Sequence, residues 1–247
     1  TTTPTTTNTG CIIHLVSSQQ PELRLNKYLA LQLGVSRREA DNLISEGKVT
    51  VNGTPAILGG RIAQTDKIQV NGRAIASAQV PFIYLALHKP TNYVCSRRAQ
   101  GDSPTIYELL PSEYHQLKTV GRLDRNSSGL LLLTNDGDFA YKMTHPKFYK
   151  VKVYTVMLDH DLAPLHQQMV SDIGVTLEDG VSKLALMRLS EDNRKEWQVT
   201  MSEGRNRQIR RTFTALGYTV DKLHRTNFGN YSLGDIKRGK YQLVDMR

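Results

Sequence analysis

The stretch that is most informative about the fold is GRLDRNSSG at residues 121–129, followed directly by LLLL at residues 130–133. The leucine run predicts a buried strand, and the Ser- and Gly-rich bend before it predicts a loop. Asp124 lies in that loop between Arg122 and Arg125, whose positive charges would favour its ionised form. The pattern fits either an ordinary surface salt bridge or a functional carboxylate.

The region after residue 82 combines β-rich runs with helical segments. We expect strands at 83–87, 130–133, 151–158, 183–189 and 197–201, and helices at 103–110, 138–144, 162–171 and 206–216. Their order is too irregular for a doubly wound parallel sheet, so the sequence predicts an α+β fold with a mixed, mainly antiparallel sheet. The stretch NDGD at residues 135–138 lacks the full calcium-binding loop and predicts a turn, with Asp138 capping the next helix.

Two further stretches carry positive charge. The first, EGRNRQIRR at residues 203–211, opens a predicted helix whose buried face holds Ile209, Phe213 and Leu216. Its arginines form either a solvated face or a set of phosphate contacts. The second, KVKVYTV at residues 150–156, alternates as a strand does and places Lys152 and Tyr154 on one face. That tyrosine is either half-buried in a sheet or exposed to stack on a nucleic-acid base.

The chain before residue 83 divides into a tail, a small unit and a linker. Residues 1–22 begin with a Thr-rich stretch that has no apolar pattern, so we expect this tail to be disordered. Residues 23–73 predict two helices and a small sheet, and Ser36 and Glu39 have the spacing of a helix capping box. Residues 74–82 are small and polar, as in a linker. Two Asn-Gly pairs predict tight hairpin turns, Asn52-Gly53 and Asn71-Gly72.

Composition narrows the classes of function. The 247 residues include 39% hydrophobic ones, enough for a packed core, but no run of roughly 20 apolar residues that would span a membrane. Two cysteines, Cys11 and Cys95, cannot form a disulfide scaffold and indicate free thiols in a reducing cytoplasm. With 32 Lys and Arg against 23 Asp and Glu, the net charge of +9 favours a polyanionic partner. Neither a nucleotide-binding glycine loop nor a metal-ligand spacing is present, so the motifs do not support nucleotide hydrolysis, dinucleotide binding or a metal site.

Taken together, these stretches resemble the pseudouridine synthases of the branch that modifies small- and large-subunit ribosomal RNA. The likeness rests on the motifs GRLDRxxSGLLLLTNDG, KxYxV and GRNRQIRR. Lys89-Pro90 is similar to the Asn-Lys-Pro motif that opens the catalytic domain of this branch, with His88 in place of the Asn. Residues 23–73 resemble the αL-motif RNA-binding domain that members carry in front of it. Residues 83–247 are then expected to form the catalytic domain.

The resemblance implies that the chain converts a uridine of ribosomal RNA to pseudouridine, without cofactor or metal, as a cytoplasmic monomer. Asp124 matches the family's essential Asp, which acts either as a nucleophile at C1′ or as a base at C2′. Tyr154 matches a tyrosine that stacks against the flipped uracil, Arg210 an arginine that pairs with the carboxylate, and Leu223 an apolar wall of the pocket. Contacts with the RNA backbone are expected from Arg37, Arg38, Arg122, Lys152, Arg205 and Arg207.

Alternatives stay open for both the substrate and the class of protein. The motif at residues 204–211 is more similar to the large-subunit enzymes, so large-subunit RNA is the expected substrate and small-subunit RNA the alternative. A non-catalytic RNA-binding protein of ribosome assembly would not need Asp124, Tyr154 and Arg210 together, which favours an enzyme. A zinc-dependent base deaminase is disfavoured because its His and Cys ligand spacing is absent.

Overall fold

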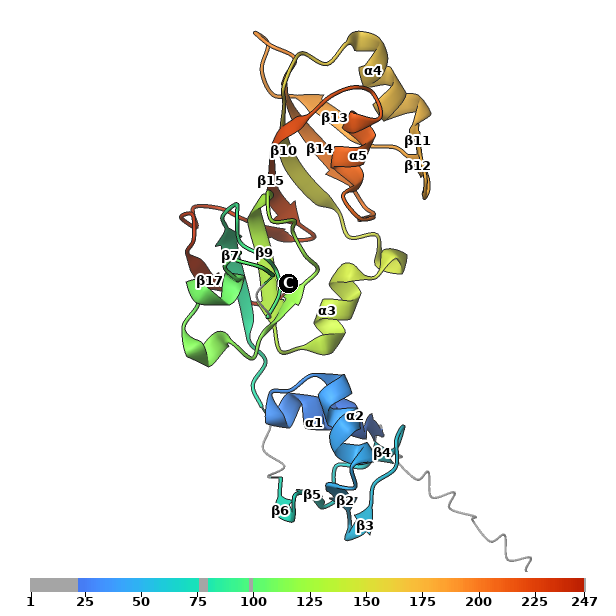
Figure 1. Ribbon diagram of the computed structural model, residues 1–247, viewed down its shortest axis with the longest axis vertical. Coiled ribbons are helices and arrows are strands. Elements are labelled where there is room, and N and C mark those ends of the chain that lie inside the picture. Colours follow the sequence, from blue (N-terminus) through green and yellow to red (C-terminus); the bar gives the residue numbers. More distant parts are fainter. Residues whose placement is uncertain (1–21, 76–79, 98–99, 247) are drawn as a thin grey trace, which may run out of the picture. The chain divides into compact units, whose positions relative to one another are not determined.

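The computed structural model describes residues 22–75, 80–97 and 100–246. The chain divides between Val80 and Pro81 into two compact units (Figure 1). This boundary lies inside the predicted linker, 74–82. The predicted tail lies outside the described residues except for Glu22, and so do linker residues 76–79.

The first unit contains two helices, α1 (Leu25–Leu33) and α2 (Arg37–Ser45). Its short strands are β1 (Leu23–Arg24), β2 (Val49–Val51), β3 (Thr54–Pro55), β4 (Arg61–Ile62), β5 (Ile68–Val70) and β6 (Arg73–Ala74). They form an antiparallel sheet in the order β3-β2-β5-β6 and a separate β1–β4 pair. The two helices and the sheet bury a common apolar core that includes Leu29, Ile44 and Val49.

Local signals in the sequence explain where these elements begin and turn. The Ser36 side chain accepts a hydrogen bond from the backbone N–H of Glu39 at 3.1 Å, and Glu39 accepts one from the N–H of Ser36 at 2.6 Å. This capping box starts α2 and confirms the prediction. Asn52 (φ 53°) and Asn71 (φ 51°) adopt the left-handed conformation that tight hairpins need, as predicted.

In the described part of the second unit, nine strands form one sheet whose main path is β13-β14-β10-β15-β9-β7-β17. These strands are β7 (Tyr84–Lys89), β9 (Ser128–Thr134), β10 (Lys152–Leu158), β13 (Ala185–Arg188), β14 (Glu196–Met201), β15 (Val220–Phe228) and β17 (Tyr241–Leu243). Strand β8 (Lys118–Val120) pairs with β9, and β16 (Tyr231–Ser232) pairs with β15. Strands β9 and β15 run parallel, whereas the other neighbours are antiparallel. The predicted mixed, mainly antiparallel α+β fold is therefore confirmed.

Both faces of this sheet are covered, which explains the unbroken leucine run of β9. Leu131 and Leu133 belong to one apolar cluster with Phe213 of α5 (Gln208–Thr214). Leu130 and Leu132 belong to a second cluster with Phe139 of α3 (Gly137–Thr144). Successive side chains of a strand point to opposite faces, so each of the four leucines of β9 has an apolar environment.

The remaining helical segments and a small hairpin complete the unit. Helix α4 (Pro164–Gln168) continues into a π-helical turn, η4 (Met169–Ile173), and the hairpin consists of β11 (Val175–Leu177) and β12 (Gly180–Ser182). Three 3₁₀ turns are η1 (Ile106–Leu109), η2 (Ser112–Tyr114) and η3 (Pro146–Phe148). None of the helices in the described residues is long and apolar enough to cross a membrane.

Several predicted elements differ from the observed ones. The predicted helix 103–110 is only the 3₁₀ turn η1, because Pro104 precedes it and Pro111 follows closely. Helix α3 is capped by Asp136, whose side chain accepts hydrogen bonds from the N–H groups of Asp138 and Phe139. The prediction that Asp138 is the cap was therefore wrong by two residues. Strand β15, the longest of the sheet, was not predicted at all.

Candidate active site

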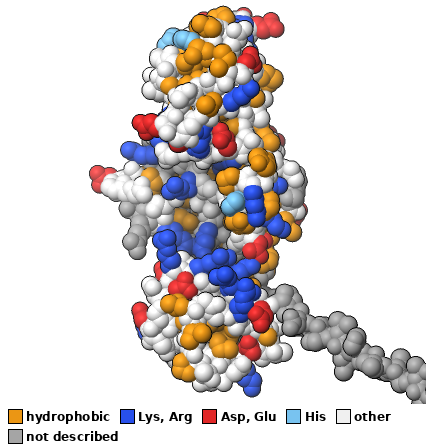
Figure 2. All heavy atoms as spheres, turned by 90° about the vertical axis from the view of Figure 1, so that its right-hand side faces the viewer, with side chains coloured by type: hydrophobic (Ala, Val, Ile, Leu, Met, Phe, Trp, Pro, Cys, Tyr) orange, Lys and Arg blue, Asp and Glu red, His pale blue; other side chains and the backbone are white. Residues whose placement is uncertain are grey.

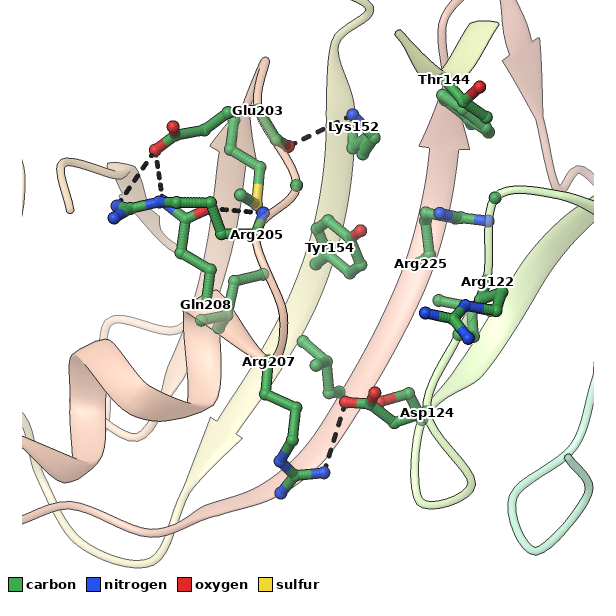
Figure 3. A pocket seen from close by; sticks show the side chains of 18 of the residues that line it. Arg122, Asp124, Thr144, Lys152, Tyr154, Glu203, Arg205, Arg207, Gln208 and Arg225 are labelled. Carbon is green, nitrogen blue, oxygen red and sulfur yellow. Dashed lines mark hydrogen bonds and ion pairs between the residues drawn. The ribbon is translucent and has the colours of Figure 1, made fainter. Parts of the chain in front are cut away.

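A cavity of about 320 Å³ opens beside the loop that joins β8 to β9 (Figure 3). The loop, strands β10 and β15, and the segment that enters α5 all contribute to its walls. The structure thereby brings together seven of the predicted site residues: Arg122, Asp124, Lys152, Tyr154, Arg205, Arg207 and Leu223. Arg37 and Arg38 lie exposed at the start of α2 in the first unit.

The Asp124 carboxylate lies close to two guanidinium groups. Its Oδ2 atom is 3.5 Å from Nη1 of Arg207 and 4.0 Å from Nε of Arg210. The Asp124 side chain is 31% exposed, so a substrate can reach it, whereas the Arg210 side chain is 11% exposed. Arg207, for which a phosphate contact was expected, is thus nearer to the carboxylate than the predicted partner Arg210. Both guanidinium groups lie within ion-pair distance of the carboxylate.

The Arg210 side chain is held from behind by backbone carbonyls. Its Nη1 donates to the carbonyl of Val220 at 2.6 Å, and its Nη2 donates to that of Asn126 at 3.1 Å. Burial, followed by the like charge of Arg207, lowers the pKa of Arg210 below its usual range. The bond to Asn126 ties α5 to the loop that carries Asp124. The arginine therefore fixes the position of the loop as well as its charge balance.

Lys89 also holds this loop, through hydrogen bonds to its backbone. This side chain is fully buried, and its ammonium group donates to the carbonyls of Pro90 at 2.9 Å, Asp124 at 3.1 Å and Ser127 at 2.8 Å. Burial lowers the pKa of Lys89 to about 8. The sequence comparison with the Asn-Lys-Pro motif marked this lysine but assigned it no task. In the fold, its task is to hold the backbone of the loop at Asp124.

Tyr154 and Lys152 lie on one face of β10 and line the cavity, as the alternation predicted. Tyr154 is buried opposite Arg225 of β15. The Lys152 ammonium donates to the carbonyls of Lys150 and Glu203, each at 3.2 Å. Burial, and then the nearby charge of Arg225, lower the pKa of Lys152 to about 8. Tyr154 and the apolar side chain of Leu223 give this wall a surface that suits a flat ring.

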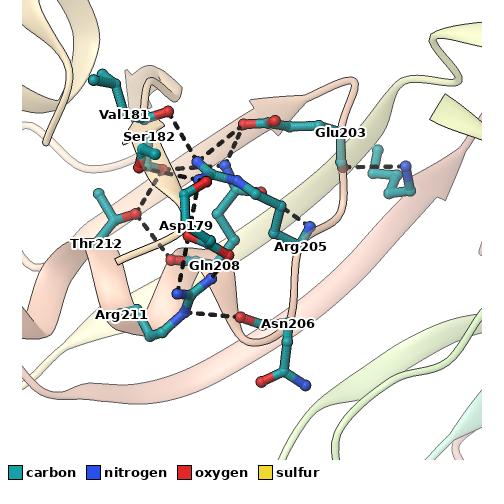
Figure 4. Close-up of polar contacts among 11 residues, drawn as sticks. Asp179, Val181, Ser182, Glu203, Arg205, Asn206, Gln208, Arg211 and Thr212 are labelled. Carbon is teal, nitrogen blue, oxygen red and sulfur yellow. Dashed lines mark hydrogen bonds and ion pairs between the residues drawn. The ribbon is translucent and has the colours of Figure 1, made fainter. Parts of the chain in front are cut away.

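Arg205 is engaged within the chain rather than free for a ligand (Figure 4). Its Nη1 contacts the Asp179 carboxylate at 2.9 Å, and its Nη2 donates to the Val181 carbonyl at 2.9 Å. Arg211 binds both oxygens of the same carboxylate, at 3.0 and 2.6 Å. These contacts fasten the β11–β12 hairpin to the segment that enters α5. The expected phosphate contact of Arg205 does not fit this geometry, which gives it a structural role instead.

The arrangement can act on a flat, ring-bearing substrate that is attached to a polyanion. The partly exposed carboxylate of Asp124 can attack an electrophilic carbon or accept a proton. Tyr154 and Leu223 offer an apolar wall, and Arg122 and Arg207 lie exposed at the cavity. These features define an enzyme that acts on a base within a nucleic acid.

Comparison with known proteins identifies the family. Residues 83–215 match the model of the RNA pseudouridylate synthases, and residues 23–57 match that of the S4 domain. The chain belongs to the RNA pseudouridylate synthase family, and it is an enzyme of this class. The predicted family and the RNA-binding type of its first domain are therefore confirmed.

The relatives cover most of the chain. It is 36% identical over 221 residues to the ribosomal large subunit pseudouridine synthase B of Bacillus subtilis, which covers 87% of this chain and 89% of the relative. It is also 36% identical over 229 residues to the ribosomal small subunit pseudouridine synthase A of Pasteurella multocida. This match covers 89% of this chain and 95% of the relative. A crystal structure of a pseudouridylate synthase superimposes with a TM-score of 0.64 and 30% identity, covering 90% of this chain and 96% of that one.

Proposed function

We propose that this chain converts a specific uridine of ribosomal RNA to pseudouridine, and that the uridine belongs to the large-subunit RNA. The observation that carries the proposal is the Asp124 carboxylate, which lies between Arg207 and Arg210 at a cavity walled by Tyr154. The named relatives act on ribosomal RNA of either subunit. The preference for the large subunit rests on the motif GRNRQIRR at residues 204–211.

The reaction is an isomerisation that needs no redox partner. The N1–C1′ bond of the uridine breaks, the detached uracil turns, and its C5 atom forms a bond to C1′. The hydrogen on C5 leaves as a proton, and N1 takes up a proton, so atoms and charge balance. The target must leave its base stack to expose C1′ and C5, at a cost of a few kcal/mol.

Asp124 is the reacting group in this proposal. As a nucleophile, its carboxylate would bond to C1′ while the uracil leaves; as a base, it would remove the proton at C2′. Both routes require an ionised carboxylate that is aimed at the sugar. Arg207 and Arg210 supply the positive charge, while Lys89 fixes the loop backbone. These groups are set before the substrate arrives, which avoids reorganisation during the reaction.

The other side chains of the cavity hold the substrate. Tyr154 stacks against the extruded uracil, and Leu223 forms the apolar wall beside it. Arg122 and Lys152 contact backbone phosphates at the cavity, and Arg37 and Arg38 contact RNA through the first unit. We also propose that the enzyme acts in the cytoplasm and as a monomer. Sedimentation of the purified chain tests its oligomeric state.

The decisive experiment compares Asp124→Asn with wild type on large- and small-subunit transcripts. Carbodiimide labelling and primer extension map the pseudouridine, and filter binding measures RNA affinity. We expect Asp124→Asn to lose at least about 10⁴-fold in rate, as when an essential nucleophile is removed, while RNA affinity is retained. The matched control, Asp221→Asn, changes an exposed carboxylate of β15 and should keep full activity. An active Asp124→Asn enzyme would refute the assignment, and modification of the small-subunit transcript alone would refute the substrate preference.

A further inference from the structure

A second cavity, of about 540 Å³, continues the first one along the protein surface. The two share a border formed by Pro146, Met201, Ser202 and Glu203. The second cavity is also lined by Lys147, Tyr149, Val151 and Lys183. Because the border residues line both hollows, a chain that leaves the cavity at Asp124 can run directly into the second one.

Tyr149 is the side chain in this groove that most resembles a stacking platform. Tyr149 is 74% exposed, although the apolar ring of a tyrosine is stabilised by contact with other groups rather than by water. The backbone that carries it is held in a defined shape: Tyr149 has a left-handed φ of 47°, and its N–H donates to the carbonyl of Pro146 at 3.0 Å. The exposed ring is therefore presented from a short, ordered turn rather than from a loose loop.

The charges of the groove suit a polyanion. Lys147 and Lys183 are exposed. Figure 2 shows the face of the molecule that carries α3, and on this face lysine and arginine side chains lie among hydrophobic ones. The Lys147 ammonium lies 4.9 Å from the centre of the Phe148 ring, and this contact restricts the positions that the ammonium can take. Glu203 is the acidic residue of the groove, but its carboxylate already accepts hydrogen bonds from Arg205 and Gln208.

We propose that this groove binds the single-stranded nucleotides next to the target uridine. The base of one flanking nucleotide stacks on Tyr149, and the backbone phosphates lie against Lys147 and Lys183. Stacking on an aromatic ring and contact with lysines are the usual means by which proteins hold single-stranded nucleic acid. This inference rests on the proposed function, because it takes the occupant of the first cavity to be a uridine within RNA.

Binding of a short oligouridine tests the groove without requiring catalysis. The probe is a fluorescein-labelled single strand of about ten nucleotides, within the usual range of site sizes, and its Kd is measured by anisotropy. We expect Tyr149→Ala and Tyr149→Asn to raise the Kd about 5- to 100-fold, as loss of one base stack does. Tyr149→Phe keeps the ring and should stay within twofold of wild type. Asn tolerates a left-handed backbone, so Tyr149→Asn separates loss of the ring from loss of the fold.

A matched control and a kinetic readout complete the test. Phe82 is also exposed, at 53%, but lines neither of these two cavities, so Phe82→Ala should leave the Kd unchanged. On a ribosomal RNA transcript, Tyr149→Asn should raise KM and keep kcat, because the groove binds ground state and transition state alike.

The outcomes separate the groove from the proposed function. An unchanged Kd in Tyr149→Asn, or an equal rise of the Kd in Phe82→Ala, would overturn RNA binding in the groove even if the enzyme forms pseudouridine. The groove would then suit a protein partner. A Kd that rises in Tyr149→Ala and Tyr149→Asn, but not in Tyr149→Phe or the control, supports RNA binding in the groove even on transcripts where no pseudouridine forms.

Discussion

Replacing Lys89 by methionine should destabilise the second unit and displace the catalytic loop. The substitution keeps the buried aliphatic chain but leaves the carbonyls of Pro90, Asp124 and Ser127 without their donor. Three hydrogen bonds from a charged donor contribute roughly 4.5–9 kcal/mol. Against this, the lowering of the Lys89 pKa from 10.5 to about 8 corresponds to roughly 3.4 kcal/mol that disfavours the buried charge. The expected net loss is about 1–6 kcal/mol in the free energy of unfolding.

Fluorescence of Trp197 gives a direct assay. This residue is the single tryptophan of the chain and is buried in the second unit, so urea unfolding reports on that unit. A loss near 3 kcal/mol would lower the Tm by about 6–12 °C, and displacement of Asp124 by about 1 Å would lower kcat by about 100-fold. The control is Lys222→Met, an exposed lysine of β15, which should stay within about 0.5 kcal/mol of wild type. Should Lys89→Met also unfold within that margin, the supporting role of Lys89 would be wrong.

The pH dependence of the stability of wild type and Lys89→Met tests whether burial lowers the pKa of Lys89. Burial lowers the pKa of Lys89 in the folded state, so between about pH 8 and pH 10.5 the unfolded chain binds more protons than the folded one. Wild type should therefore gain stability relative to Lys89→Met as the pH rises through this window, because the penalty for burying the charge disappears. A stability difference that stays constant from pH 7 to pH 10 would contradict the lowered pKa of Lys89 in the folded state.

Two further substitutions test the strand pairing and the cavity charge. In Gly129→Ala, the new Cβ would lie 2.2 Å from the Arg225 carbonyl oxygen at a φ of +108°, so we expect a loss of at least about 3 kcal/mol. Gly217→Ala, at a φ of +90° in open space, should lose less, and equal urea midpoints would contradict the close approach. Lys152 loses its charge above its pKa of about 8, so RNA affinity should fall a few-fold between pH 7 and pH 9. Lys152→Met should abolish that dependence in filter binding; an unchanged slope would assign it to another group.

Much of the fold could be predicted because local patterns and long-range packing agree. The leucine run of β9 is apolar on both faces, and the fold covers both faces. The capping box at Ser36 and Glu39 and the two Asn-Gly turns depend on hydrogen bonds and backbone angles within a few residues. Asp124 and Tyr154 also reach one cavity, as their motifs implied. Such local features can be predicted because they depend on residues that are close together in the sequence.

Strand β15 shows what the sequence alone conceals. Its residues VDKLHRTNF mix charged and apolar side chains and match neither a surface nor a core strand. Arg225 is nevertheless buried, because its Nε donates to the Leu130 carbonyl at 2.9 Å and its guanidinium lies 4.7 Å from the centre of the Phe228 ring. The Leu130 carbonyl becomes available to Arg225 only after β15 has paired with β9. The different tasks of Arg205 and Arg207 likewise depend on which acid lies nearby, Asp179 or Asp124.

Strand β15 also bears on when the site can form during synthesis of the chain. It pairs with β10 on one side and with β9 on the other, and so joins the part of the sheet that carries Tyr154 to the part that follows Asp124. A growing polypeptide that has passed residue 211 already contains the carboxylate, the tyrosine and the arginines, but not the strand that joins the two parts of the sheet. We therefore expect chains that end before residues 220–228 to lack activity, because their cavity also lacks Leu223 and Arg225.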